Sequence, residues 1–278
     1  MPADQQPEVF THKTPRVAAA RRLTTRSGRS KAGRFLAEGA QAVGEALASA
    51  HRVQELFVTP VAAQRHGTLV RRARDRGITV SAVTERAGEL LSETVTPQGL
   101  VAVCDSVDVP LPAALAGQAH LVAVLVGVTD PGNAGTVVRT ADAAGADAVV
   151  FLGDSVDVHN GKSVRASAGS VFHVPIARAE RLDDVLAACR SAGLTTVAAD
   201  GKAHQDLVGY QRSARLGRPT AWLFGSEAHG LDGHTVAAAD EAVRVPIYGG
   251  AESLNLASAA TVCLYSSAMA RRQEGRSD

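Results

Sequence analysis

Two kinds of segment alternate along the chain: short apolar runs, and longer stretches in which apolar residues recur at helical spacing. HLVAVLVGV at 120–128 is almost entirely apolar, which predicts a buried strand. In the stretch 34–50, residues such as Leu36, Ala40 and Val43 recur every three or four positions, which predicts a helix. Continuous apolar strands that alternate with helices are typical of an α/β fold with a parallel sheet covered on both faces.

The order of these elements predicts two α/β domains. Residues 1–20 are polar, hold three prolines and show no clear period, and we expect a basic flexible arm over residues 1–30. A small α/β domain is predicted over 31–107. DVPLPAALAGQ at 108–118 carries two prolines and a glycine, which predicts a linker. The larger domain is expected over 119–278.

The elements expected in the small domain are helix 34–50, strand 53–60, helix 69–77, strand 78–83, helix 85–93 and strand 99–105. Those expected in the larger domain are strand 120–128, helix 133–144, strand 147–153, helix 163–170, strand 172–177, helix 182–193, strand 194–200, strand 220–225, helix 231–239, strand 242–247 and helix 253–271. The polar, Arg-rich stretch 201–218 is expected to be a connection.

The amino-acid composition is that of a globular protein without a disulfide framework or a membrane-spanning segment. The 278 residues suffice for two domains, and 45% hydrophobic and 21% charged residues are ordinary for a globular protein. Cys104, Cys189 and Cys263 are far apart and show no metal-ligand spacing or disulfide framework. We therefore expect no metal and a reduced, cytoplasmic location. No apolar stretch is long enough to cross a bilayer, so no membrane partner is expected.

Positive charge is concentrated near the start of the chain, although the formal net charge is only +1. From His12 to Arg34 there are eight Lys or Arg residues and no acid. Such clusters bind phosphate backbones, and the alternative is a solvated basic surface. The candidates for RNA binding are Arg21, Arg22, Arg26, Arg29, Lys31 and Arg34. A second basic cluster comprises Arg65, Arg71, Arg72, Arg74 and Arg76.

Three segments place polar residues directly after apolar strands. They are DPGNAGTVVRT at 130–140, LFGSEAHGL at 223–231 and VPIYGGAESLNLASAA at 245–260. In open α/β sheets, ligands bind at the carboxyl ends of the strands. We therefore expect the three segments to converge on one small-molecule site.

Each segment also has an alternative interpretation in which it plays only a structural part. Arg139 can pair with Asp142 on its own helix, and Glu227 can be an exposed loop carboxylate. Ser253 is suited to cap a helix that opens there. Asn255 is then expected inside the first turn, where its amide offers a donor and an acceptor.

Taken together, the three segments resemble the three signature motifs of the SpoU (TrmH-like) RNA 2′-O-ribose methyltransferases, within the SPOUT class. SVRASAGSVFHVPI at 163–176 resembles the segment that this family carries between its first two motifs. KAGRFLAEGAQAVGEAL at 31–47 and TPQGLVAV at 96–103 resemble the small substrate-binding domain, similar to ribosomal-protein L30e, that many members carry. The resemblance covers roughly residues 30–270.

The resemblance implies a C-terminal α/β-knot domain with a trefoil knot, and an L30e-like N-terminal domain. It implies S-adenosylmethionine (SAM) as methyl donor, and a homodimer formed through the C-terminal domain. The residues that match catalytic positions of the family are Asn133, Arg139, Glu227, Ser253 and Asn255. Those that match cofactor-contact positions are Gly225, Val245, Ile247 and Leu254.

The predicted function is therefore methyl transfer from SAM to a ribose 2′-OH of structured RNA, 23S rRNA in preference to tRNA. One alternative is a non-catalytic RNA-binding factor on the same fold, which the full set of matching catalytic residues disfavours. Another is a nicotinamide-dependent enzyme on a doubly wound sheet. It is disfavoured because the first motif has Gly132 and Gly135 but no GxGxxG.

Overall fold

The computed structural model describes residues 9–274 and divides them into two compact units. The first unit comprises the described residues up to Val107 together with Asp157–Phe172. The second comprises Asp108–Val156 and the described residues from His173 onward. The segment 157–172 lies within the predicted larger domain by sequence, yet its contacts place it in the first unit.

The first unit is built on a four-stranded sheet in the order β1-β4-β2-β3. Its strands are β1 Arg34–Glu38, β2 Val53–Val58, β3 Thr79–Ala82 and β4 Leu100–Asp105. β4 pairs antiparallel with β1 and β2, whereas β2 and β3 are parallel. The sheet is therefore mixed.

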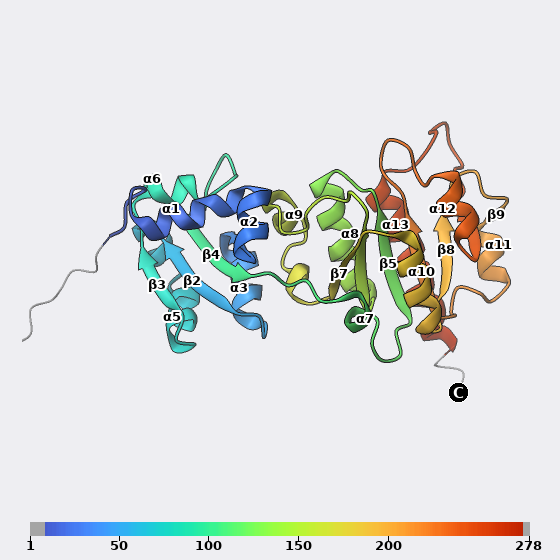
Figure 1. Ribbon diagram of the computed structural model, residues 1–278, viewed down its shortest axis with the longest axis horizontal. Helices are drawn as coiled ribbons and strands as arrows, with labels where there is room; N and C mark the ends of the chain where they lie inside the picture. Colours follow the sequence, from blue (N-terminus) through green and yellow to red (C-terminus); the bar gives the residue numbers. More distant parts are fainter. Residues whose placement is uncertain (1–8, 275–278) are drawn as a thin grey trace, which may run out of the picture. The chain divides into compact units, whose positions relative to one another are not determined.

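Helices cover both faces of this sheet (Figure 1). They are α1 Pro15–Arg21, η1 Arg22–Thr24, α2 Arg26–Ala32, α3 Gly39–Ala48, α4 Pro60–Arg65, α5 Gly67–Asp75, α6 Glu85–Leu90, α9 Gly161–Ala166 and η2 Ser170–Phe172. Residues of α1, η1 and α6 share one buried apolar cluster with the sheet. α3 contacts β1, β4 and α5 on the other face.

The prediction of a flexible arm is wrong for residues 9–30, and residues 1–8 lie outside the described part of the chain. Val17, Ala20 and Leu23 are buried against the sheet and hold α1 and η1 in place. The backbone N–H of Phe10 also donates to Ala82 O at the edge of β3. Apolar residues only three positions apart therefore anchor a segment whose composition is dominated by basic side chains.

The predicted helix 34–50 is a strand followed by a helix. Residues 34–38 pair with β4, and Phe35, Leu36 and Ala37 are all buried because the strand is covered on both faces. α3 then begins at Gly39, whose φ of +88° favours glycine. The buried residues of β1 and of α3 happen to follow one another at helical spacing, so the sequence pattern predicted a single helix.

Arg29 joins α2 to the segment 157–172 inside the first unit. Its side chain is only 5% exposed and donates to the Asp157 carboxylate at 2.7 Å and to the carbonyls of Leu23 and Thr24. Burial raises the pKa of Asp157, but hydrogen bonds from His159 and Arg29 outweigh it and hold that pKa far below its ordinary value. Arg29 therefore has a structural role, and we remove it from the RNA-binding candidates.

The second unit contains a seven-stranded sheet, all of whose described pairings are parallel, in the order β7-β6-β5-β10-β8-β11-β9. Its strands are β5 Leu121–Val126, β6 Ala148–Leu152, β7 Ile176–Ala179, β8 Thr195–Ala199, β9 Gln205–Asp206, β10 Thr220–Phe224 and β11 Glu241–Arg244. The parallel α/β architecture predicted for the larger domain is confirmed.

Helices lie on both faces of this sheet (Figure 1). They are α7 Leu111–Ala114, α8 Pro131–Ala144, α10 Leu182–Ser191, α11 Leu207–Arg212, α12 Gly233–Ala238 and α13 Leu256–Glu274. α7 and α10 share one apolar cluster with strands β5, β6 and β10. On the other face, α13 packs against α8, α11 and β10, where the buried Trp222 donates to Ser267.

Two predictions for this unit are corrected. The expected linker 108–118 contains α7, and its Ala114 and Leu115 belong to the core because they pack under the sheet. The expected connection 201–218 contains β9 and α11, whose Tyr210 is buried against Trp222. None of the described helices is long and apolar enough to span a membrane.

Candidate functional site

The three motif segments meet at one edge of the sheet in the second unit. β5 and β10 are parallel neighbours, with Phe224 opposite Leu125, so the segments that follow them leave the same edge. The segment 245–255 follows β11 and continues into α13. All three segments therefore place side chains at the carboxyl ends of parallel strands, as the sequence predicts.

Glu227 is the centre of a hydrogen-bond network between these segments. Its carboxylate accepts from the side-chain amide of Asn133 at 3.0 Å and from the backbone N–H groups of Thr129 and Asp130 at 3.4 and 3.3 Å. The Asn255 amide in turn donates to the Asn133 carbonyl oxygen at 3.0 Å. Three predicted site residues, one from each segment, are thus linked directly.

The environment of Glu227 favours its ionised form. Partial burial raises the pKa of this carboxyl, but the hydrogen bonds from Asn133, Thr129 and Asp130 hold it below the ordinary value. Glu227 is therefore a fixed acceptor that orients Asn133. It is poorly suited to act as a proton donor near neutral pH.

Asn255, and not Ser253, caps the last helix. α13 begins at Leu256, three residues later than predicted, and Asn255 Oδ1 accepts from the N–H groups of Ala257 and Ser258. The carbonyl oxygen of Asn255 is therefore used by the helix, and its NH₂ group is used by Asn133. This leaves Ser253 exposed in the loop before the helix.

A cavity of about 980 Å³ lies beside this network. The predicted residues that line it are Gly225, Glu227, Val245, Ile247, Ser253, Leu254 and Asn255. Sequence reasoning missed the wall formed by Asp200, Gly201 and Lys202, which follows β8 and carries no recognised motif.

Gly225 is required by the tight loop that closes one side of the cavity. A Cβ at this position would lie 2.0 Å from the carbonyl carbon of Gly230. Ser226 and Gly230 exchange backbone hydrogen bonds across the loop, and Gly230 has a φ of +69°. The two glycines therefore let Glu227 project from a compact turn.

Arg139 is the predicted catalytic residue that neither joins the hydrogen-bond network of Glu227 nor lines the cavity, whereas Ser253 lines the cavity without joining the network. Arg139 lies six residues after Asn133 on α8, about one-third of a turn away around the helix axis and about 9 Å farther along it. Its side chain is exposed and has no hydrogen-bond or ion-pair partner among the described residues. Asp142 pairs with His173 at 2.9 Å, so the predicted alternative pairing with Arg139 is not formed.

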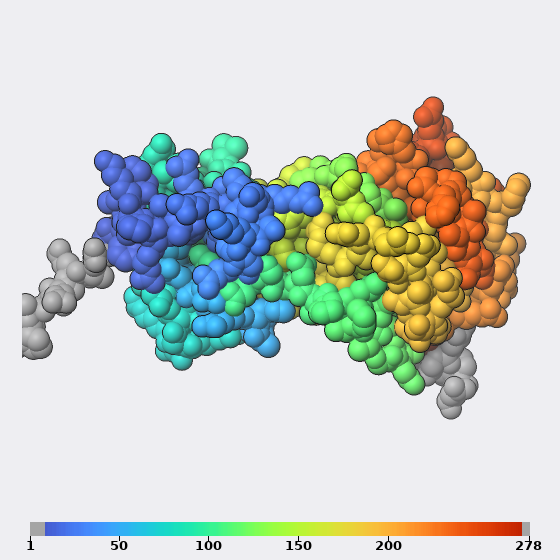
Figure 2. Space-filling view, viewed as in Figure 1, coloured from blue at the N-terminus to red at the C-terminus, as the bar shows by residue number. Residues whose placement is uncertain are grey.

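The remaining basic candidates lie at the surface of the first unit. Figure 2 shows the dark blue atoms of its first helices at the surface. The exposed candidates are Arg21, Arg22, Arg26, Lys31 and Arg34. Only Arg34 has an ion-pair partner among the described residues, with Asp105 at 3.3 Å.

The described residues hold no group of three or more His, Cys, Asp or Glu side chains arranged for a metal. The three cysteines are buried, and burial raises the pKa of Cys189 to about 11 and of Cys263 to about 12. These thiols are therefore core residues and poor nucleophiles.

Comparison with known proteins identifies the family. The model of the SpoU rRNA Methylase family matches residues 120–265, and that of the MRM3-like substrate binding domain matches residues 14–102. The chain belongs to the SpoU rRNA methylase family.

Relatives of the SpoU family match along nearly the whole chain. A Bacillus subtilis protein named 23S rRNA (guanosine(2553)-2′-O)-methyltransferase RlmP is 35% identical over 93% of this chain and 98% of its own length. A Streptomyces viridochromogenes protein named 23S rRNA (uridine(2479)-2′-O)-methyltransferase is 31% identical over 94% of this chain and 96% of its own.

Solved SpoU-family structures share the fold. The AdoMet-bound rRNA methyltransferase from Sinorhizobium meliloti superposes with a TM-score of 0.81 and 30% identity, covering 96% of this chain and 98% of that one. The methyltransferase AviRb from Streptomyces viridochromogenes, in complex with AdoMet, gives 0.81 and 29% identity over 93% of this chain and 99% of that one.

Proposed function

We propose that this protein transfers a methyl group from SAM to a ribose 2′-OH of 23S rRNA. The observation that carries the proposal is the linked cluster of Glu227, Asn133 and Asn255 beside a cavity of about 980 Å³. The names of the relatives favour rRNA over tRNA as substrate.

The cavity is suited to hold SAM. Val245, Ile247 and Leu254 provide apolar surface, and the close-packed turn at Gly225 offers backbone groups. The volume lies within the range of cavities that hold ligands of this size. Bound SAM supplies a methyl group already activated by its sulfonium charge, so the chain needs only to position and activate the ribose.

Asn133 and Asn255 are proposed to orient the ribose or Arg139, with Glu227 fixing the position of Asn133. Ser253 is exposed at the cavity and can donate or accept a hydrogen bond there. Arginine is always protonated, so we assign Arg139 to grip the adjacent phosphate and stabilise the oxyanion that develops on the 2′-oxygen. The 2′-hydroxyl proton is proposed to leave with the assistance of that phosphate.

We propose a homodimer that forms through the second unit. On α13, Val262, Tyr265 and Met269 are 37%, 38% and 55% exposed, at spacings of three and four residues. Such an apolar stripe on the outer face of a helix is suited to a subunit contact. Since Arg139 stands apart from the cluster in one chain, a site near the subunit boundary is consistent with this arrangement.

The first unit is proposed to bind structured RNA as an L30e-like domain, through the exposed basic residues of α1 and α2. The second unit is proposed to carry the trefoil knot expected of the α/β-knot class. Because its proposed substrate is ribosomal RNA, the protein is expected to act in the cytoplasm.

The test is a methyl-transfer assay with labelled SAM on 23S rRNA and tRNA isolated from cells that lack the gene. We expect label in 23S rRNA at one nucleotide. The methyl group on its 2′-oxygen should make the phosphodiester that follows it resistant to alkaline hydrolysis. Binding of both SAM and RNA without transfer would instead indicate a non-catalytic RNA-binding factor.

A further inference from the structure

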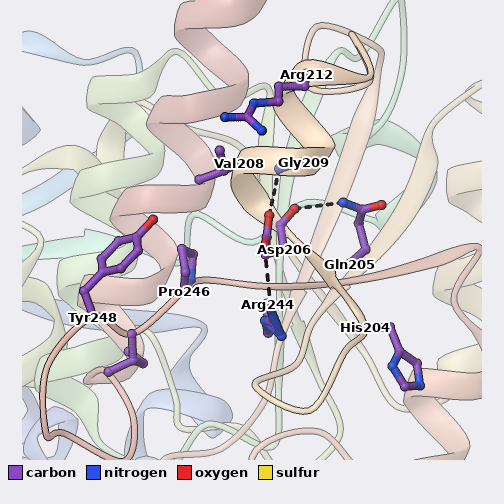
Figure 3. A pocket seen from close by; sticks show the side chains of 10 residues that line it. His204, Gln205, Asp206, Val208, Gly209, Arg212, Arg244, Pro246 and Tyr248 are labelled. Atoms are coloured by element: carbon purple, nitrogen blue, oxygen red, sulfur yellow. Dashed lines mark hydrogen bonds and ion pairs between the residues drawn. The ribbon is translucent and has the colours of Figure 1, made fainter.

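A second cavity, of about 750 Å³, lies in the second unit (Figure 3). It is lined by β9, α11 and the segment after β11. Arg244, Pro246 and Ile247 line both cavities. We call this second cavity the side pocket. A ligand in it would be separated from the larger cavity by only one segment of chain.

The charge of the side pocket favours an anionic ligand. Arg212 is exposed and has no ion-pair partner among the described residues. Arg244 lies 3.6 Å from Asp206, with both side chains more than a third exposed. The Asp206 carboxylate, which also accepts from Gly209 N–H at 2.7 Å, carries one negative charge and so balances only one of the two guanidiniums that line the pocket.

The side pocket also carries an exposed aromatic ring. Tyr248 is 87% exposed, although aromatic side chains usually bury most of their surface. In the view of Figure 3 its ring lies on one side of the pocket and His204 on the other, with Asp206 and Arg244 between them. An exposed ring beside guanidinium groups is the combination that binds single-stranded nucleic acid, with the ring stacking on a base.

We propose that the side pocket binds one nucleotide of the RNA substrate, next in sequence to the methylated one. Tyr248 stacks on its base, and Arg212 and Arg244 contact its phosphate. The inference rests on the proposed function and deepens it, because it names the part of the chain that holds the RNA beside the target ribose. A second copy of this chain is a less suitable occupant, since it would have to bury the charge of Arg212.

Tyr248→Ala and Arg212→Gln test the proposal in the full-length protein, with 23S rRNA from cells lacking the gene as the probe. Each variant should raise KM for the RNA about tenfold, while SAM affinity stays at the wild-type value. Tyr248→Phe, which keeps the ring, should recover most of the RNA affinity that Tyr248→Ala removes. Arg181→Gln is the matched control, because Arg181 is 70% exposed, pairs only with Asp183 in the described chain and does not line the pocket.

The outcomes separate this inference from the proposed function. If the wild-type protein does not methylate 23S rRNA, the proposed function fails first. If it does methylate the RNA and Tyr248→Ala and Arg212→Gln keep the wild-type KM, the side pocket is not an RNA site. If Tyr248→Ala changes the sedimentation of the protein as well as its KM, Tyr248 belongs to a subunit contact and the inference is overturned.

Discussion

The polar residues of the two units are used in opposite ways. In the second unit, Asn133, Glu227 and Asn255 satisfy one another through hydrogen bonds, and each has one fixed orientation. In the first unit, Arg21, Arg26 and Lys31 of α1 and α2 are exposed and have no ion-pair partner among the described residues. A fixed cluster is suited to chemistry that depends on orientation, whereas an exposed, unpaired positive surface is suited to a polyanion.

Removing Arg139 should have the largest effect on activity. Arg139→Ala is expected to lower kcat for methyl transfer by about 100-fold or more, because it removes a charge placed to stabilise the transition state. SAM affinity, measured by calorimetry, should stay within about twofold since Arg139 does not line the cavity. Thr136→Ala, at another exposed position of α8, is the control. Wild-type turnover in Arg139→Ala would remove Arg139 from the mechanism.

Arg29 distinguishes structural from RNA-binding arginines within the first unit. Arg29→Ala should lower the free energy of unfolding of that unit by about 3 kcal/mol, because it removes the Arg29 guanidinium from the part-buried Asp157 carboxylate and leaves only His159 beside it. Arg26 lies on the same helix and is exposed, so Arg26→Ala should change the free energy of unfolding by less than about 0.5 kcal/mol. Urea denaturation measures both, and equal effects would contradict the structural role of Arg29.

The Arg29 effect should also depend on pH. The pKa of Asp157 is depressed in the folded state, so its stabilisation is fully present above its ordinary value of 3.8 and is lost as pH falls toward the folded-state value. Unfolding free energies at pH 7 and about pH 3 should therefore show a smaller difference between wild type and Arg29→Ala at the lower pH. A constant difference would assign the stability to packing of the Arg29 side chain.

Glu227→Gln tests the fixed cluster with nearly unchanged volume. The amide is a weaker acceptor for the Thr129 and Asp130 N–H groups, so Asn133 should lose its orientation. We expect kcat to fall about tenfold with a smaller change in SAM affinity. Because the pKa of Glu227 is already lowered, the wild-type pH profile should show no loss from this group above its ordinary value of 4.5. A Glu227→Gln variant with normal kcat would reduce Glu227 to a loop residue.

Convergence of the three motifs could be predicted from sequence because it follows from parallel strands whose carboxyl ends meet at one edge. The position of Asn255 could not, since capping by its own side chain moved the helix start from Ser253 to Leu256. The burial of Arg29 depends on Asp157, 128 residues away, and no local pattern signals that contact. The prediction of a flexible arm also failed because α1 and η1 are held by contacts with the sheet, which the basic composition of this segment does not reveal.

The smallest expected effect is on RNA binding by the first unit, which carries exposed basic residues both on its first helices and on α5. Replacing Arg21, Arg22 and Arg26 by Gln should weaken 23S rRNA binding. The slope of log affinity against log salt concentration is negative, and its magnitude should fall by about one for each phosphate that the protein no longer neutralises. The matched set, Arg71, Arg72 and Arg74 on α5, removes the same charge from exposed positions of a helix that packs with α3. If only the first set changes the slope in filter-binding titrations, the RNA lies along α1 and α2. Equal changes would mean that the RNA binds to both faces, and an unchanged slope in the first set would exclude α1 and α2 from the RNA-binding surface.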